Sequence, residues 1–204
     1  MMKIRPEQEA DFREVENLTR EAFWNVYRPG CMEHLVLHDL RRDPCFVREL
    51  DYLAEEDGRI VAHIAYARGR LETEDGRTAD SLLFGPVSVL PECQGRGHGS
   101  KLIEFTLEKA REMGFPTVVI TGTPEYYSRF GFVPAAIRGI YLNGLDKSMD
   151  APFFMVKVLD EAAAKEIRGV HHDPDCYEVD EQTLEKFDRG FPPKVKEKRP
   201  GQLV

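Results

Sequence analysis

Residues 49–90 alternate short apolar runs with polar residues, in the period-two pattern typical of β-strands. Two dipeptides, Asp57-Gly58 and Asp75-Gly76, interrupt this pattern, and apolar residues flank each of them. Asp-Gly is a preferred sequence for tight hairpin turns, because glycine readily adopts a positive φ. The segment is therefore expected to form an antiparallel meander of three strands.

Three other segments place their apolar residues at helical spacing. The first follows Asp11, a residue suited to cap a helix, and its apolar positions are Phe12, Val15, Leu18, Ala22 and Phe23. A second, shorter helix is expected over residues 31–40. The third is expected to end at Gly114, and its apolar stripe consists of Ile103, Leu107, Ala110 and Met113.

The remaining pattern predicts further strands at residues 2–5, 117–121 and 153–159, and a brief helix at 125–130. The β-branched run TVVIT at 117–121 suits a strand that is buried on both faces. Residues 160–204 mix charged residues and proline. One domain over residues 1–159 is expected, followed by a C-terminal extension, 160–204, packed on the domain or on a partner.

Composition narrows the class of protein. The 204 residues suffice for a substantial core, and 42% of them are hydrophobic, as in an ordinary globular protein. The net charge of −8 argues against a nucleic-acid-binding protein, which normally carries a basic surface. No apolar run approaches the roughly 20 residues of a membrane span, and the N-terminal residues lack the apolar core of a secretory signal. We expect a cytoplasmic protein without nucleic-acid or membrane partners.

The cysteines and histidines show no metal-ligand spacing. The four cysteines, Cys31, Cys45, Cys93 and Cys176, are scattered, so free thiols are expected rather than a disulfide or zinc framework. The run His171–Cys176 contains side chains that bind metals, but its spacing favours a polar surface loop. No metal is predicted.

The strongest chemical signal is the stretch Gln94-Gly95-Arg96-Gly97-His98-Gly99, which separates a predicted strand from a predicted helix. Free amides at a helix N-terminus, together with the helix dipole, bind anions, and glycines let a phosphate approach the backbone closely. The spacing fits neither the Walker loop nor the dinucleotide fingerprint. Three alternating glycines could also serve only a tight strand-to-helix turn.

This stretch resembles the Q/R-x-x-G-x-G/A acyl-CoA signature of the GNAT N-acetyltransferases. The resemblance extends to the order of elements over residues 2–159 and to the downstream sequence YYSRFGF. It implies an α/β (α+β) fold with a mixed, mostly antiparallel central sheet flanked by helices and splayed at an acyl-CoA slot. It also implies acetyl-CoA as the acetyl donor.

The family pattern assigns site residues to this chain. The backbone of Val87 and Val89 would pair with the pantetheine arm, and the amides of Gln94 to Ser100 would hold the pyrophosphate. His98 would contribute only its backbone, while Arg96 could contact phosphate or solvent. The implied cofactor-binding residues are Val87, Ser88, Val89, Gln94, Gly95, Arg96, Gly97, His98, Gly99 and Ser100.

The same pattern implies that Tyr127 is the general acid. Tyrosine has a pKa of about 10, so it is protonated at neutral pH and can donate to a departing thiolate whose pKa is about 8.5. Tyr126, Phe130 and Phe132 are expected to be core aromatics, and a core position is also the alternative for Tyr127.

No general base is identified from the sequence. The candidates are His63, Glu72 and Glu74, but a histidine in a strand is more often structural, and charges beside a hairpin are usually solvated. No residue is a clear nucleophile, so direct attack by the amine on the thioester is favoured. Cys93 is the thiol nearest the loop, and it is interpreted as a small loop residue.

The sequence therefore predicts an acetyl-CoA-dependent N-acetyltransferase that modifies an amine of a small molecule or a protein. A non-catalytic acyl-CoA-binding sensor or interaction module is the alternative. Many members of the family pair as homodimers, and the pattern does not decide whether this chain does. The acceptor pocket is expected near residues 23–40 and 138–145.

Overall fold

The computed structural model describes residues 2–165 and 167–202. Its contacts divide the chain into two compact units. The first unit contains the residues up to Ala65, Pro86–Leu102 and the residues from Asp175 onward, and the second contains Tyr66–Gly85 and Ile103–Pro174. The strands β3 (Arg59–Thr73) and β4 (Thr78–Val89) and the helix α3 (His98–Glu112) run from one unit into the other.

The sheet of the first unit is antiparallel. The strand β1 (Lys3–Pro6) pairs with β2 (Tyr52–Glu56), and β2 pairs with the first half of β3. Both predicted hairpin turns are present: Asp57 and Gly58 separate β2 from β3 with φ of 52° and 80°, and Gly76, with φ of 79°, lies between β3 and β4. The predicted meander is confirmed.

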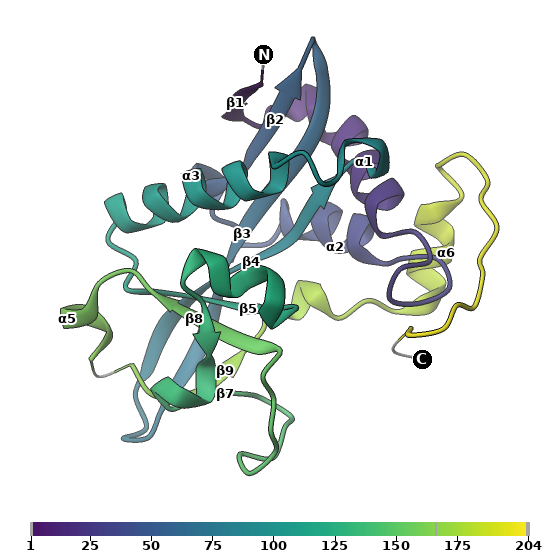
Figure 1. Ribbon diagram of the computed structural model, residues 1–204. Coiled ribbons are helices and arrows are strands. Elements are labelled where there is room, and N and C mark those ends of the chain that lie inside the picture. Colours follow the sequence, from purple (N-terminus) through teal and green to yellow (C-terminus); the bar gives the residue numbers. More distant parts are fainter. Residues whose placement is uncertain (1, 166, 203–204) are drawn as a thin grey trace. The chain divides into compact units, whose positions relative to one another are not determined.

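Two helices, α1 (Phe12–Phe23) and α2 (Glu33–Leu40), pack against each other in the first unit (Figure 1). Asp11 is the N-cap residue of α1, as expected, but its side chain makes no cap hydrogen bond to the helix. The Asp11 carboxylate accepts hydrogen bonds from the backbone N–H of Gln8 and from the guanidinium of Arg5, 2.6–2.9 Å away. It therefore stabilises the 3₁₀ turn Glu9–Asp11 that precedes the helix.

The C-terminal residues of the first unit lie on these two helices (Figure 1). In the helix α6 (Glu181–Asp188), Asp188 accepts two hydrogen bonds from the fully buried Arg20 of α1, at 2.6 and 3.1 Å. Further along, the Val195 carbonyl accepts from the indole of Trp24 and from the amide of Asn25, both at 3.0 Å.

The second unit contains a mixed sheet. The strand β5 (Thr117–Thr121) runs parallel to β4, with Leu82 opposite Val118, and antiparallel to β8 (Phe154–Val158). β8 also pairs with the short β6 (Val133–Pro134). β5 is buried on both faces as predicted, since Val118, Val119 and Ile120 are at most 4% exposed.

Besides β6, two further strands of the second unit were not predicted. The strand β9 (Gly169–His172) pairs antiparallel with β3 and parallel with β7 (Ile140–Leu142). The expectation of a polar surface loop at His171–Cys176 is therefore wrong at its start, because His171 is fully buried in β9. A four-residue strand with two histidines carries no local pattern, and its pairing with β3 and β7 makes it a strand.

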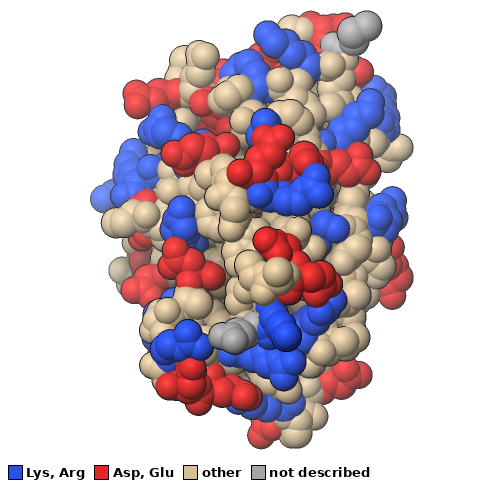
Figure 2. Space-filling model, turned by 90° about the vertical axis from the view of Figure 1, so that its left-hand side faces the viewer, with Lys and Arg blue, Asp and Glu red and all other residues tan. Residues whose placement is uncertain are grey.

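The other short elements are the helices α4 (Pro124–Tyr127) and α5 (Glu161–Ala164). α3 ends at Glu112, so the expectation that Met113 belongs to the apolar stripe of this helix is wrong: Met113 follows the helix and is 42% exposed. Among the described residues, no helix is long and apolar enough to cross a bilayer. On the face shown in Figure 2, basic and acidic side chains alternate. The absence of a nucleic-acid partner stays a prediction.

Candidate active site

The glycine loop, residues 94–99, lies in the first unit, follows β4 and includes the first two residues of α3. Gly95 and Gly97 have φ of 75° and 86°, a left-handed conformation that side chains with a Cβ rarely adopt. A Cβ added at either glycine would have no atom within 4 Å. The two glycines are therefore required by the backbone conformation rather than by close packing, and the space beside them is open to a ligand.

Hydrogen bonds beneath the loop fix its position. The backbone N–H of Leu90 donates to the Val61 carbonyl of β3 at 3.0 Å, and that of Cys93 donates to the Leu90 carbonyl at 2.8 Å. The Gln94 side chain donates to the Val89 carbonyl at 3.2 Å. α3 starts directly behind, where the N–H of Lys101 bonds the Gly97 carbonyl. The first N–H groups of a helix have no partner within the helix, so those preceding Lys101 are available to an anion.

The side chains along the end of β4 alternate between the interior and a more open side. Ser88 is fully buried, and its hydroxyl donates to the Thr19 hydroxyl of α1 at 3.0 Å. Val87 and Val89 are half-buried. Only the backbone of Ser88 could therefore face a ligand, whereas Val87 and Val89 lie on the more open side.

The side chains of His98 and Arg96 differ in exposure. His98 is 4% exposed and packs on the first strands, with Nδ1 3.2 Å from the Met2 sulfur and Nε2 3.7 Å from the Glu56 carboxylate. This burial agrees with a role for the His98 backbone alone. Arg96 is exposed.

Tyr127 lies in the second unit at the end of α4, half-buried among aromatic rings. Its ring centroid is 6.0 Å from those of Phe84 and Phe132 and 4.9 Å from that of Tyr126. A Cβ added at Gly122 would overlap the Tyr127 ring, so the ring lies directly against the Gly122 backbone. The surrounding aromatic groups and Gly122 thus determine where the phenol lies.

Of the three aromatic residues near Tyr127 that were expected in the core, Phe130 and Phe132 lie there and Tyr126 does so only in part. Phe130 and Phe132 are buried, at 8% and 1% exposed, and Tyr126 is half-buried. Beneath them lies Tyr66, whose hydroxyl is 2.9 Å from the Thr106 hydroxyl; burial raises the pKa of Tyr66 far above its usual range. Tyr66 is therefore a permanently neutral core residue.

Among the base candidates, His63 has a structural environment. It is fully buried in β3, with Nε2 2.7 Å from the Asp51 carboxylate and 3.6 Å from that of Glu7. Burial lowers the pKa of His63, but the two carboxylates outweigh it and raise the pKa to about 9. A fully buried imidazolium between two acids cannot take a proton from a substrate amine.

The remaining base candidates are exposed. Glu72 lies beside Arg70, and their hydrogen bond lowers the pKa of the Glu72 carboxyl, which makes it a weaker base. Glu74 is exposed beside the hairpin turn. No base is assigned.

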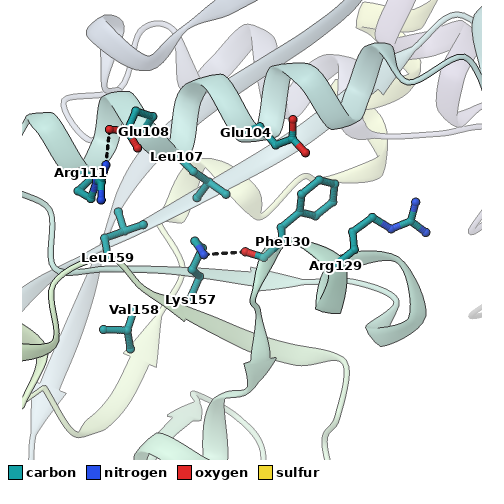
Figure 3. Close-up of a pocket in the computed structure, with 9 residues that line it drawn as sticks. All are labelled: Glu104, Leu107, Glu108, Arg111, Arg129, Phe130, Lys157, Val158 and Leu159. Carbon is teal, nitrogen blue, oxygen red and sulfur yellow. Dashed lines mark hydrogen bonds and ion pairs between the residues drawn. The ribbon is translucent and has the colours of Figure 1, made fainter.

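A pocket of about 370 Å³, which the sequence analysis did not identify, lies in the second unit between α3, the 3₁₀ turn Ser128–Phe130 and β8 (Figure 3). Its apolar wall comes from Leu107, Val158 and Leu159. Of its charged groups, Arg111 pairs with Glu108, and the Lys157 ammonium donates to the Phe130 carbonyl at 2.6 Å. Arg111 and Lys157 thus already have protein partners, and we assign no ligand to this pocket.

The sequence model of the acetyltransferase (GNAT) domain family matches residues 3–135 of the chain. The chain belongs to the GNAT acetyltransferase family. The predicted family and enzyme class are thereby confirmed.

Two relatives are the uncharacterized N-acetyltransferases YjhQ and YhbS of Escherichia coli K12. YjhQ is 39% identical over 87 residues, which are 43% of the chain and 48% of YjhQ. The match therefore spans about half the length of YjhQ. YhbS is 29% identical over 135 residues, which span 66% of the chain and 75% of YhbS.

Two solved structures of GNAT proteins have similar folds. YhbS of Escherichia coli, in complex with CoA, superposes with a TM-score of 0.74 at 24% identity, covering 86% of the chain and 91% of YhbS. A GNAT acetyltransferase of Brucella melitensis, in complex with acetyl-CoA, has a TM-score of 0.68 at 28% identity, covering 87% of the chain and 99% of that protein. The predicted GNAT fold class, with a mixed and mostly antiparallel sheet, is confirmed.

Proposed function

We propose that this GNAT protein transfers the acetyl group of acetyl-CoA to an amine by direct attack of the amine on the thioester. The observation that carries the proposal is the left-handed conformation of Gly95 and Gly97 directly before α3, with open space beside both residues. A related GNAT structure from Brucella melitensis holds acetyl-CoA, and that of YhbS holds CoA.

In this proposal the glycine loop binds the donor. The pyrophosphate accepts hydrogen bonds from the amides of Gln94 to Ser100, where the helix dipole of α3 adds to the attraction. Val87 and Val89 pair with the pantetheine arm through their backbone groups. Ser88 contributes only its backbone, because its side chain is turned into the protein.

Tyr127 is proposed as the general acid. The neutral amine attacks the thioester carbonyl, the carbon–sulfur bond breaks, and the departing thiolate takes the phenolic proton of Tyr127. The attacking nitrogen loses its own proton to solvent as the amide forms, and solvent then reprotonates the tyrosinate. Backbone amides that polarise the carbonyl stabilise the oxyanion that develops during attack.

Direct attack is supported by the position of the nearest thiol. Cys93 is 5% exposed and lies in the 3₁₀ turn Pro91–Cys93 beneath the glycine loop. A buried thiol at this position is poorly placed to carry an acetyl group. Loss of acetyl transfer in Cys93→Ala, with normal CoA binding, would overturn direct attack.

The acceptor is proposed to be an amine of a small molecule or a protein. The acetyltransferase domain is proposed to comprise residues 1–159, with residues 160–204 as an extension. The contacts of Asp188 with Arg20 and of Val195 with Trp24 support an extension that lies partly on α1. A cytoplasmic location and a homodimer remain proposals.

The test is calorimetric titration with acetyl-CoA, combined with a panel of amines and detection of the released thiol. Binding with turnover of at least one amine would support the proposed enzyme. Binding without turnover of any amine would favour the non-catalytic sensor. An absence of acetyl-CoA binding would overturn the role of the glycine loop.

Gly97→Ala is expected to weaken acetyl-CoA binding at least about tenfold, which corresponds to about 1.4 kcal/mol. The added Cβ strains the left-handed backbone and occupies space that the phosphate needs. Gly76→Ala is the matched control, because Gly76 has φ of 79° and equally open surroundings in a hairpin turn. Calorimetry should find normal acetyl-CoA affinity in the control. Equal affinities in the two variants would contradict the role of Gly97.

Gly122→Ala is expected to lower kcat by about 10- to 100-fold, because the new methyl group must displace the Tyr127 ring. Acetyl-CoA affinity should change less, since the pyrophosphate site is elsewhere in the chain. Thr123→Ala is the control, because this exposed neighbour makes no side-chain cap bond to α4. Steady-state kinetics would compare the two variants, and an unchanged kcat in Gly122→Ala would show that the position of Tyr127 does not limit the reaction.

A further inference from the structure

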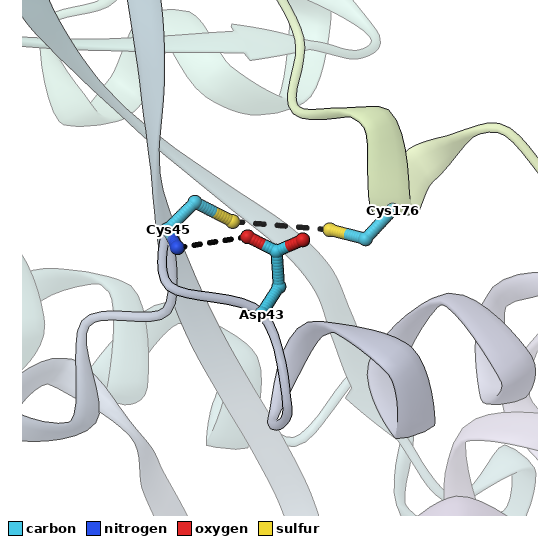
Figure 4. Close-up of side chains that lie close together, drawn as sticks. All are labelled: Asp43, Cys45 and Cys176. Carbon is cyan, nitrogen blue, oxygen red and sulfur yellow. Dashed lines mark hydrogen bonds between the residues drawn. The ribbon is translucent and has the colours of Figure 1, made fainter.

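Three potential metal ligands come together in the first unit, and the proposed acetyl transfer uses none of them (Figure 4). The Sγ atoms of Cys45 and Cys176 are 3.8 Å apart, although the two residues are separated by 131 positions in the sequence. The Asp43 carboxylate lies beside both thiols, and one ligand atom from each residue lies within 4.8 Å of the other two.

Hydrogen bonds in the loop after α2 hold Asp43 and Cys45 in place. In the loop after α2, the N–H of Asp43 donates to the Leu40 carbonyl at 3.0 Å, and the N–H of Cys45 donates to Asp43 Oδ1 at 2.8 Å. Cys176 lies in the 3₁₀ turn Asp175–Tyr177 at the start of the C-terminal segment. All three side chains are half-buried, so a small ion can reach them without unfolding of the chain.

We infer that Asp43, Cys45 and Cys176 bind a thiophilic divalent cation of the Zn²⁺ type. Zinc–thiolate bonds are about 2.3 Å long, and two such bonds at a tetrahedral angle place the sulfurs about 3.8 Å apart. The two sulfurs already have this separation. The carboxylate supplies a third ligand, and the fourth tetrahedral position is taken by water.

The neighbouring carboxylate favours a cation over a disulfide. A disulfide requires the sulfurs to approach to about 2.05 Å and one thiol to ionise first. The sulfurs of Cys45 and Cys176 lie 3.8 Å apart, which is the separation of two ligands of one cation and not that of two bonded sulfurs. A divalent cation would bind both sulfurs as thiolates at this separation, release their protons, and be attracted by the adjacent Asp43 carboxylate.

The bound cation would link the C-terminal segment to the loop after α2. α2 and the 3₁₀ turn that carries Cys176 are already in contact. A ligand that binds only the folded chain raises its melting temperature, so metal binding is expected to stabilise this unit. The inference does not depend on acetyl transfer, and its test requires no measurement of activity.

The test uses the full chain, reduced and freed of metal with a chelator, and titrated with Co²⁺ as a spectroscopic probe. One equivalent of Co²⁺ should produce a thiolate-to-cobalt charge-transfer band, and Zn²⁺ should displace it. Cys45→Ser and Cys176→Ser should lose the band. Asp43→Asn should weaken Co²⁺ affinity about tenfold or more.

Cys31→Ala and Asp39→Asn are the controls, because they replace a thiol and a carboxylate outside the three-residue cluster, and both should keep the band. Circular dichroism would verify that each variant is folded. Zn²⁺ should also raise the melting temperature of the unmodified chain but not that of Cys176→Ser. Absence of the band in the reduced chain, or its persistence in both serine variants, would overturn the inference.

Discussion

Tyr127→Phe is expected to lower kcat for acetyl transfer by roughly 10²- to 10⁴-fold, the range that a positioned general acid contributes. The substitution removes the only proton that this side chain can donate. It keeps the ring, whose contacts with Phe84 and Phe132 hold the local packing. Acetyl-CoA affinity should therefore remain close to that of the unmodified chain, and steady-state kinetics with calorimetry would measure both quantities.

Tyr126→Phe is the matched control for this experiment. Tyr126 is the preceding residue on α4, is also half-buried, and its ring lies below the Arg129 guanidinium at 4.7 Å. Loss of its hydroxyl should leave kcat nearly unchanged. Equal turnover by Tyr127→Phe and the unmodified chain would remove Tyr127 as the acid while leaving the enzyme itself in place.

His63→Gln is expected to lower the free energy of unfolding at neutral pH by about 3 kcal/mol. The buried imidazolium is held between Asp51 and Glu7, and Glu7 also accepts hydrogen bonds from Arg41 at 2.5 and 3.0 Å. A pKa of about 9 instead of 6.5 corresponds to a stabilisation of about 3 kcal/mol. Glutamine removes the positive charge and leaves the Asp51 carboxylate without its charged partner.

The same network predicts how stability depends on pH. Because the folded chain raises the pKa of His63, its contribution is complete below pH 6.5 and is lost as the pH rises through about 9. The free energy of unfolding, measured by urea denaturation, should therefore fall over this interval in the unmodified chain and change less in His63→Gln. His172→Gln is the control, because His172 is partly exposed beside Glu72. Parallel pH profiles for His63→Gln and the unmodified chain would contradict a charged His63.

Several elements could be predicted because their signals are local. The turns at Asp57-Gly58 and Asp75-Gly76 require positive φ, which Asp-Gly supplies, and they divide the meander correctly. The β-branched run at 117–121 identified a strand buried on both faces. The three alternating glycines indicated a strand-to-helix loop open to an anion, since their conformational freedom is a property of the residue itself.

Other features depend on residues that are distant in the sequence. The strand β9 exists because it pairs with β3 and β7, and its own four residues have no strand pattern. His63 was expected to be structural, but neither its charge nor its partners Glu7 and Asp51 could be read from the chain.

The sequence by itself determined the family, the order of the main elements and the glycine loop, because turn residues, periodicity and a short motif act within a few positions. Only the tertiary structure decided that Cys45 meets Cys176, that Asp43 lies beside both, and that Gly122 supports the Tyr127 ring. Side-chain contacts of this kind arise from packing between separate segments, and no local pattern of residues encodes which segments will meet.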